Sequence, residues 1–333
     1  QSLTRVWSFL PHALYGAISR LPLAVIGMQA TTVPESTLCY IAYSFGRALT
    51  AASTTTFTGQ PKESALLGMI LSGCMYALLL CNANLSAPCC FLLGSSEVQV
   101  SLDVLAKASV EDLRGHFIAM EGGAFLAIGL SGPVFEVHGL VGIGKLGLLL
   151  VVLLCAIIIV SAKPGKLVRG VKNAGGTTTS QLFVCISMIC SSAVISTLLI
   201  VAPRLYLSEW HLGARSFSFD YSAGVLLGIL LNSTGPWPTL PLVAAFSILP
   251  LLPVSRVLIV VLFGLNPPTH SAVHSFLCAQ GCNPESMSAA YACRRVANIG
   301  FMVLSAFLYQ WKGARAALFF AASVTCLWTI LLI

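Results

Sequence analysis

Long apolar runs, separated by short polar or Pro- and Gly-containing breaks, fill almost the whole chain. A membrane-spanning helix needs about 20 predominantly apolar residues, and most of these runs are close to that length. The segment 147–161 is the clearest, because it contains no charged side chain and no histidine. We therefore predict an all-α fold, a polytopic bundle of about 12 transmembrane helices.

The predicted spans form two sets on either side of a basic, glycine-rich linker. The first set is 11–32, 37–55, 64–82, 85–107, 116–137 and 142–162. The second set is 181–205, 217–232, 238–253, 256–278, 286–310 and 314–333, in which the second and third members are short enough to form one broken pair. The pattern divides the chain into an N-terminal six-helix half (1–162), a linker (163–180) and a C-terminal six-helix half (181–333).

Composition indicates that the solvent of this bundle is lipid. Only 9% of the 333 residues are charged and the mean hydropathy is +0.89, whereas soluble domains carry roughly 25% charged residues. No stretch between the spans is polar and long enough to fold as a separate soluble domain. Any activity must therefore lie within or between the helices, in contact with membrane lipid.

The net charge of +7 does not indicate a nucleic-acid partner, because the basic residues are scattered among loops without an interleaved aromatic stripe. The one basic cluster is in the linker, at Lys163, Lys166, Arg169 and Lys172. Positively charged loops favour the cytosolic side, so we expect the linker and both termini there.

The sequence predicts no enzyme, cofactor or metal site. It contains no nucleophile with a companion base and no phosphate-binding glycine loop. Most of the 12 cysteines lie inside apolar runs, where cysteine behaves as a small hydrophobic residue. Their spacing matches neither a disulfide framework nor a four-ligand zinc site.

Two six-span halves joined by a charged linker resemble the plan of the major facilitator superfamily. A local match lies in the fifth span, where Gly129, Gly132 and Pro133 are similar to the Gly-Pro signature of the family. Small residues there allow close helix packing, and Pro bends the axis. The family's charged latch loop is largely missing, since 58–63 keeps only a glycine and a lysine and 232–239 carries no charge. The resemblance implies two halves that rock around a central site.

Ionisable residues within the predicted spans are the candidates for that site. Each costs roughly 2.5–3.5 kcal/mol at a helix centre and needs a partner or a water-filled cavity. In the resembled family, spans one, four, seven and ten line the cavity, and Arg20, Glu97, His270 and His274 fall on those spans. We predict that these residues, together with Glu121 of the fifth span, form the solute or proton pathway.

Glu97 lies nearest to mid-membrane among the acids, where a carboxyl can exchange a proton near neutral pH. The alternative is a structural ion pair of Glu97 with Arg20 or Arg47. For Arg47 we favour the structural role, because the second span of the resembled family packs between the halves.

A polar cluster follows the fourth span. Asp103 and Lys107 are four residues apart and can form a structural charge pair on one helix face. Glu121 begins one turn inside the next span and can reach either this cluster or the cavity; we favour the cluster.

Two further pairs leave alternatives open. His270 and His274 share one face after the Pro267–Pro268 kink, and we favour a wet crevice there over a metal site. Arg294 and Arg295 begin the eleventh span; they either hold an anionic group or extend to lipid phosphates.

Two functions fit these observations. The architecture favours a secondary transporter that moves a small solute by alternating access, with proton coupling through Glu97. The reduced latch loops favour a transport-incompetent relative that is a structural subunit of a larger membrane complex. Because the sequence begins at Gln1 without a methionine, we expect a processed N-terminus and an organellar, energy-converting membrane for that complex.

Overall fold

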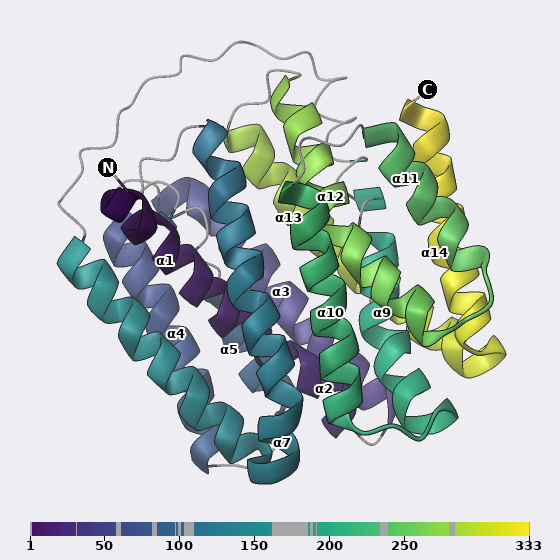
Figure 1. The fold of residues 1–333 in the computed structure, drawn as a ribbon, viewed down its shortest axis with the longest axis horizontal. Coiled ribbons are helices and arrows are strands. Elements are labelled where there is room, and N and C mark those ends of the chain that lie inside the picture. Colours follow the sequence, from purple (N-terminus) through teal and green to yellow (C-terminus); the bar gives the residue numbers. More distant parts are fainter. Residues whose placement is uncertain are drawn as a thin grey trace.

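Helices form every secondary-structure element that the computed structural model describes (Figure 1). The described residues are 2–30, 32–57, 61–81, 85–96, 98, 101–102, 110–161, 186, 189–190, 192–233, 239–279 and 284–332. The N-terminal helices are α1 (Ser2–Arg20), α2 (Leu23–Gln29), α3 (Val33–Phe57), α4 (Pro61–Cys81), α5 (Ala87–Ser95) and α7 (Val110–Ser161). The C-terminal helices are α9 (Ala193–Arg204), α10 (Ala214–Ser233), α11 (Thr239–Ile248), α12 (Arg256–Ala279), α13 (Pro284–Lys312) and α14 (Ala314–Leu332). Two short helical turns, η1 (Leu205–Glu209) and η2 (Leu249–Leu251), follow α9 and α11.

Two breaks distinguish these helices from the predicted spans. The first predicted span is divided into α1 and α2 at Pro22, which has no N–H to donate and restricts the residue before it. The fifth and sixth predicted spans form the two arms of α7, which meet at Gly139 (φ 61°, ψ −156°). Glycine adopts this positive φ without steric cost, and Figure 1 shows the arms meeting at the lower edge of the molecule.

Three helical segments among the described residues are long and apolar enough to cross a membrane: Phe9–Gln29, Lys62–Cys81 and Gly115–Val160. The segments Arg256–Asn266 and Ala314–Trp328 are apolar but shorter. The segment within α7 contains the Gly139 break and is 46 residues long, which is enough for two crossings. The total of about twelve crossings stays a prediction.

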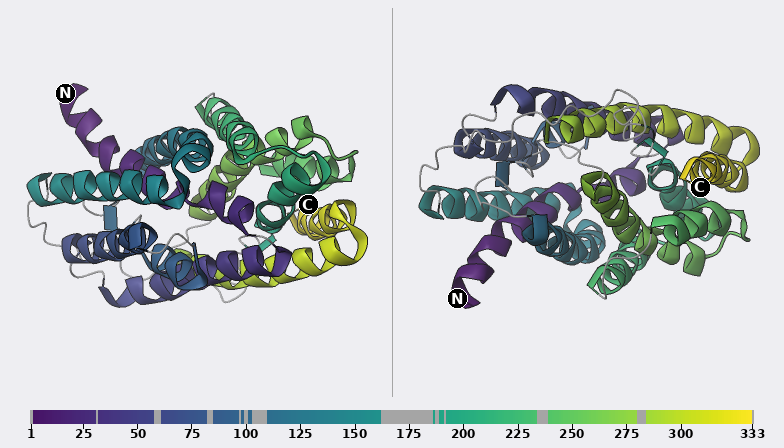
Figure 2. Two further views of the ribbon diagram at one scale, coloured as in Figure 1. Left: turned by 90° about the horizontal axis from the view of Figure 1, so that it is seen from below. Right: turned by 90° about the horizontal axis from the view of Figure 1, so that it is seen from above.

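The helices pack as an N-terminal group (α1–α7) and a C-terminal group (α9–α14), which lie side by side in Figure 2. The principal contacts between the groups are those of α7 with α10 and of α3 with α13. The second predicted span therefore lies between the groups, as its place in the resembled family implied. The predicted linker 163–180 lies outside the described residues, so the division at that point stays a prediction.

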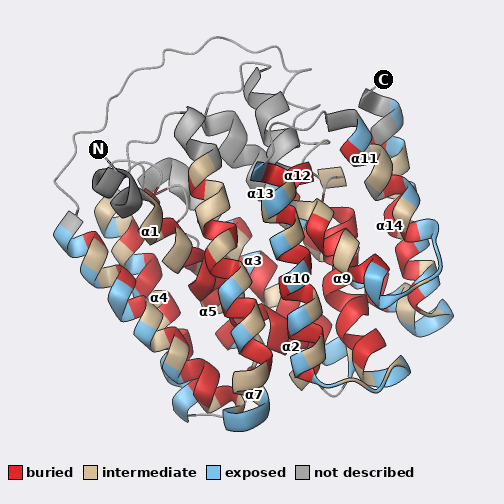
Figure 3. Ribbon diagram, viewed as in Figure 1, coloured by how far each residue is buried: buried red, intermediate tan, exposed pale blue. Residues whose placement is uncertain are grey.

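Burial follows this arrangement, with buried residues inside each group and exposed ones on the outer surfaces (Figure 3). Large apolar side chains remain exposed on the outer surface, among them Val137, Val160, Val257 and Ile330. In a bilayer such side chains contact lipid, so their exposure there carries no hydrophobic cost.

Glycines set the closest approach within the N-terminal group, where α1 crosses α7. A Cβ added at Gly123 would lie 1.8 Å from the carbonyl oxygen of Ala13, and one added at Gly16 would lie 1.9 Å from that of Met120. Neither position has room for a methyl group. The two backbones therefore touch, and side chains on either side of the crossing are brought together.

The crossing gives a paired prediction. Gly123→Ala should lower the free energy of unfolding by about 1–3 kcal/mol, because backbone atoms must move to admit the methyl group. Gly122→Ala is the matched control, since a Cβ there meets nothing within 4 Å; its stability should be unchanged or higher by up to about 1 kcal/mol. Thermal unfolding of the purified protein in mild detergent measures both. Equal losses in the two variants would contradict the tight crossing.

Candidate functional site

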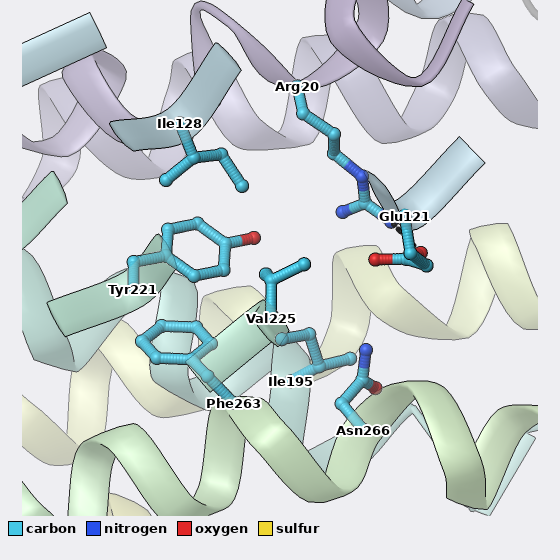
Figure 4. Close-up of a pocket in the computed structure, with 8 residues that line it drawn as sticks. All are labelled: Arg20, Glu121, Ile128, Ile195, Tyr221, Val225, Phe263 and Asn266. Atoms are coloured by element: carbon cyan, nitrogen blue, oxygen red, sulfur yellow. Dashed lines mark ion pairs between the residues drawn. The ribbon is translucent and has the colours of Figure 1, made fainter. Parts of the chain in front are cut away.

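A narrow pocket lies between the two helix groups (Figure 4). The cavity itself is only about 10 Å³, room for about one water molecule and far below the roughly 300–1,000 Å³ of typical small-molecule sites. Five helices contribute to it. The lining residues are Arg20 of α1, Glu121 and Ile128 of α7, Ile195 of α9, Tyr221 and Val225 of α10, and Phe263 and Asn266 of α12.

An ion pair between α1 and α7 forms the charged side of the pocket. Nη2 of Arg20 lies 3.8 Å from Oε1 of Glu121, and the two side chains are 22% and 7% exposed. Tyr43, Arg47 and Tyr221 lie within electrostatic range of Arg20. The contact joins the C-terminal end of α1 to α7 within the glycine crossing, since Glu121 lies between Met120 and Gly123. The sequence favoured the polar cluster after the fourth span as the partner of Glu121. The structure places Glu121 against Arg20; the cluster residues Asp103 and Lys107 lie outside the described residues, so their contact with Glu121 stays a prediction.

Aromatic rings form the opposite side of the pocket. The rings of Tyr221 and Phe263 stack with centroids 4.1 Å apart, and Phe217 packs against both. Gly224 makes this packing possible, because a Cβ there would lie 2.7 Å from the Cβ of Phe263. Figure 4 shows the rings facing the Arg20–Glu121 pair across the pocket, with the Asn266 amide below the ion pair. The pocket thus combines an apolar wall with a few polar groups, the usual composition of a small-molecule site.

A second titratable pair lies on the same α1–α7 interface. The rings of His12 and His116 stack in parallel with centroids 4.0 Å apart, and the ring of Phe9 meets His116 edge-on at 5.3 Å. Both histidines are buried. His116 precedes Glu121 by five residues and His12 precedes Arg20 by eight, so the histidines lie roughly one and a half and just over two helical turns from the ion pair.

One end of the interface between the groups is held by polar contacts. The buried Arg204, at the end of α9, donates from Nη2 to the carbonyl oxygen of Thr32 (2.5 Å) and to the hydroxyl of Ser36 (3.4 Å). The backbone N–H of Arg215 donates to Oε1 of Glu136 (2.8 Å), where a carboxylate at the N-terminus of α10 is favourable. We call these contacts, which join α7 to α10 and α9 to the α2–α3 turn, the end contacts.

A hydrogen-bond network within the C-terminal group lies next to the end contacts and joins η1, α10 and α12. Asp220 accepts hydrogen bonds from the Tyr206 hydroxyl and from Nε of Arg256, the latter at 2.7 Å. The carboxylate thus joins η1, α10 and α12 at one point. This network fixes the position of Arg204, because η1 follows it directly in the chain.

The predicted site residues are distributed as follows. Arg20 and Glu121 line the pocket. Arg47 lies on α3, where Nη1 donates to the hydroxyl of Tyr43 at 3.1 Å. His270 and His274 belong to α12, but their side chains lie outside the described part of the structure. The remaining predicted residues, Glu97, Asp103 and Lys107, also lie outside it.

The predicted packing motif lies in α7, against α10. A Cβ at Gly129 would lie 3.0 Å from Oγ of Ser222, and one at Gly132 would lie 2.5 Å from Oγ of Ser218. Pro133 is inside the same helix, six residues before the Gly139 break. The two glycines therefore face the interface between the two groups.

Sequence reasoning missed Tyr221, Phe263, Asn266 and Ile195. Three of them are apolar or aromatic residues in apolar spans, where nothing in the sequence separates a pocket wall from a helix contact. Asn266 had a usable signal. It is a polar residue next to Pro267 and Pro268 within a predicted span, and a polar amide within an apolar span needs a hydrogen-bond partner or a cavity.

Comparison by sequence finds nothing, since no family model and no curated protein matches this chain. The fold matches two solved transporters. The human organic anion transporter MFSD10 (TETRAN) superposes with a TM-score of 0.73 at 14% identity, over 99% of this chain and 99% of the other. The POT family transporter PepTSo superposes with a TM-score of 0.72 at 10% identity, over 99% of this chain and 97% of the other. The chain therefore has a major-facilitator-like fold, as its sequence plan suggested. Its long apolar helices indicate an integral membrane protein.

The Arg20–Glu121 pair yields a prediction for stability. Arg20→Gln and Glu121→Gln should each cost about 1–3 kcal/mol, because each leaves a poorly solvated charge behind. The double variant should be more stable than the sum of the two losses predicts, by at least about 0.5 kcal/mol. Thermal unfolding in detergent of the wild type, the two single variants and the double variant completes this double-mutant cycle. The exposed Glu63 is the control, because the stability losses of Glu63→Gln and Arg20→Gln should add. If the losses of Arg20→Gln and Glu121→Gln also add, the ion pair is contradicted.

Proposed function

We propose that this protein is a secondary transporter, which moves a small solute by alternating access between its two helix groups. The observation that carries the proposal is the pocket, which combines an ion pair from α1 and α7 with aromatic and amide side chains from α10 and α12. A site built from both groups changes shape whenever the groups move relative to each other. The two transporters of the same fold add support by analogy only.

Alternating access requires contacts that close one face at a time. The end contacts of Arg204 and Glu136 join the groups at one face, and the small pocket volume is consistent with a site closed on that side. In the proposed cycle these contacts break when that face opens. The end contacts are few and are hydrogen bonds. Replacing them with hydrogen bonds to water changes the free energy little, so the face can open at low cost.

Proton coupling is proposed to act through Glu121. Protonation of Glu121 would remove its attraction for Arg20 and free the guanidinium to bind solute. The stacked histidines His12 and His116 lie on the same α1–α7 interface. Glu97, His270 and His274 stay predictions for the same pathway.

A structural role in a larger complex is the second candidate. It is favoured by the pocket volume, which is below that of typical ligand sites, and by the reduced latch loops. In this role the chain would lie in an organellar membrane and bind other membrane subunits. Native-gel migration of the endogenous protein separates the candidates, because a transporter of this kind should migrate alone and a subunit with its neighbours.

Uptake into proteoliposomes tests the transporter directly. The purified chain should move at least one solute from a panel of organic anions, organic cations, sugars and peptides, faster with an inward proton gradient. Glu121→Gln should abolish the dependence on the gradient, because an amide cannot exchange the proton. Glu63→Gln, at an exposed position, should leave it intact. The proposal fails if the wild-type protein moves none of the panel.

A further inference from the structure

The ion pair beside the pocket is too long for a direct hydrogen bond. Nη2 of Arg20 and Oε1 of Glu121 are 3.8 Å apart, whereas a direct N–H···O bond measures about 2.7–3.2 Å. No residue in the described part of the chain donates a hydrogen bond to the Glu121 carboxylate, although this side chain is only 7% exposed. Buried polar groups are nearly always hydrogen-bonded, so the carboxylate needs a further donor.

The cavity next to the pair has the right size for a water molecule. At about 10 Å³, it lies at the lower limit for holding one, which is roughly 10–15 Å³. A water that accepts a hydrogen bond from Arg20 and donates one to Glu121, each about 2.8 Å long, can join atoms up to about 5.6 Å apart. The 3.8 Å separation of the pair lies within that range. Polar contacts longer than a hydrogen bond are commonly bridged in this way.

Polar groups of the C-terminal helices also reach the cavity. Tyr221 of α10 and Asn266 of α12 line it together with the ion pair. Figure 4 shows the Tyr221 hydroxyl pointing toward Arg20 and the end of the Asn266 side chain pointing toward Glu121. Apolar cavities of this kind stay dry, whereas a cavity with two to four polar partners holds water. The two side chains and the ion pair together supply four.

The rest of the cavity wall is apolar, and it encloses this position. It consists of Ile128, Ile195, Val225 and Phe263. These side chains offer no hydrogen bond, so the four polar groups alone fix where a water lies and how it is oriented.

We propose that this cavity binds one ordered water molecule, which bridges the ion pair of the N-terminal group to Tyr221 and Asn266 of the C-terminal group. The water is then a contact between the two groups at the level of the pocket. Its role in transport rests on the proposed function: the contact breaks when the groups separate, and the water gives Glu121 a partner that both donates and accepts a proton. The binding of the water makes a separate claim.

Radiolytic labelling of the purified protein in mild detergent tests this site. A short X-ray pulse converts a bound water into a hydroxyl radical, which modifies an aromatic ring in contact with it, while a scavenger in the buffer removes radicals formed in the bulk solvent. Phe263 lines the cavity and Phe217 does not, although both rings are 1% exposed. Phe263 should therefore be modified several-fold faster than Phe217, which is the internal control.

Two variants show whether the excess labelling comes from the cavity. Val225→Ile adds one methylene to the cavity wall and should lower the rate at Phe263 to that at Phe217. Asn266→Leu removes a polar partner at similar volume and should lower it as well. Val201→Ile is the matched control, because Val201 is buried in α9 but does not line the cavity; the excess at Phe263 should persist. The comparison of the two rings in the wild type needs no variant, so a folding defect does not affect it.

The water site is overturned if Phe263 and Phe217 of the wild type are modified at the same rate, or if Val225→Ile and Asn266→Leu both leave the excess unchanged. Excess labelling that these variants remove, in a protein that moves no solute, would refute the transport function alone. Solute uptake without excess labelling would refute the water site alone.

Discussion

The cost of placing charge inside an apolar bundle determines how this molecule is arranged. An ionisable side chain in a membrane interior must meet a partner, a cavity or a ligand. Arg20 and Glu121 meet each other across the α1–α7 crossing, and the pocket lies where this pair faces the C-terminal helices. The site is therefore located at the point where the N-terminal group carries its buried charge.

Backbone contact makes that location possible. Gly16 and Gly123 let α1 and α7 touch, so the short reach from Arg20 to Glu121 follows from two positions without side chains. Glycines also allow close packing between the groups, where Gly132 lies against Ser218 and Gly27 lies against Pro203. Small residues thus set the geometry, and few polar contacts are needed to hold the interface, which suits two groups that move past each other.

The sequence predicted helices well because a span of lipid-compatible residues is a strong signal, and the two-group plan followed from their order. It predicted the site less well. Arg20 and Glu121 stood out because charge in an apolar run is rare, but their pairing depends on the α1–α7 crossing, which no local pattern encodes. Tyr221 and Phe263 gave no signal, since aromatic residues are ordinary in such spans. The position of Arg294 also needed the structure, because only its burial, at 5% exposed, distinguishes it from a cation that extends to lipid.

The central claim is that the two helix groups move relative to each other around the pocket. A disulfide between Gly27→Cys on α2 and Pro203→Cys on α9 would join the groups. A Cβ at Gly27 would lie 2.6 Å from the Cβ of Pro203, so the two backbones must move apart by about 1 Å to reach disulfide geometry. Solute uptake by this double variant in proteoliposomes, measured oxidised and then reduced, is the most direct test. The account predicts that oxidation stops uptake, that reduction restores it, and that neither single variant responds. Full uptake by the verified cross-linked protein would contradict it.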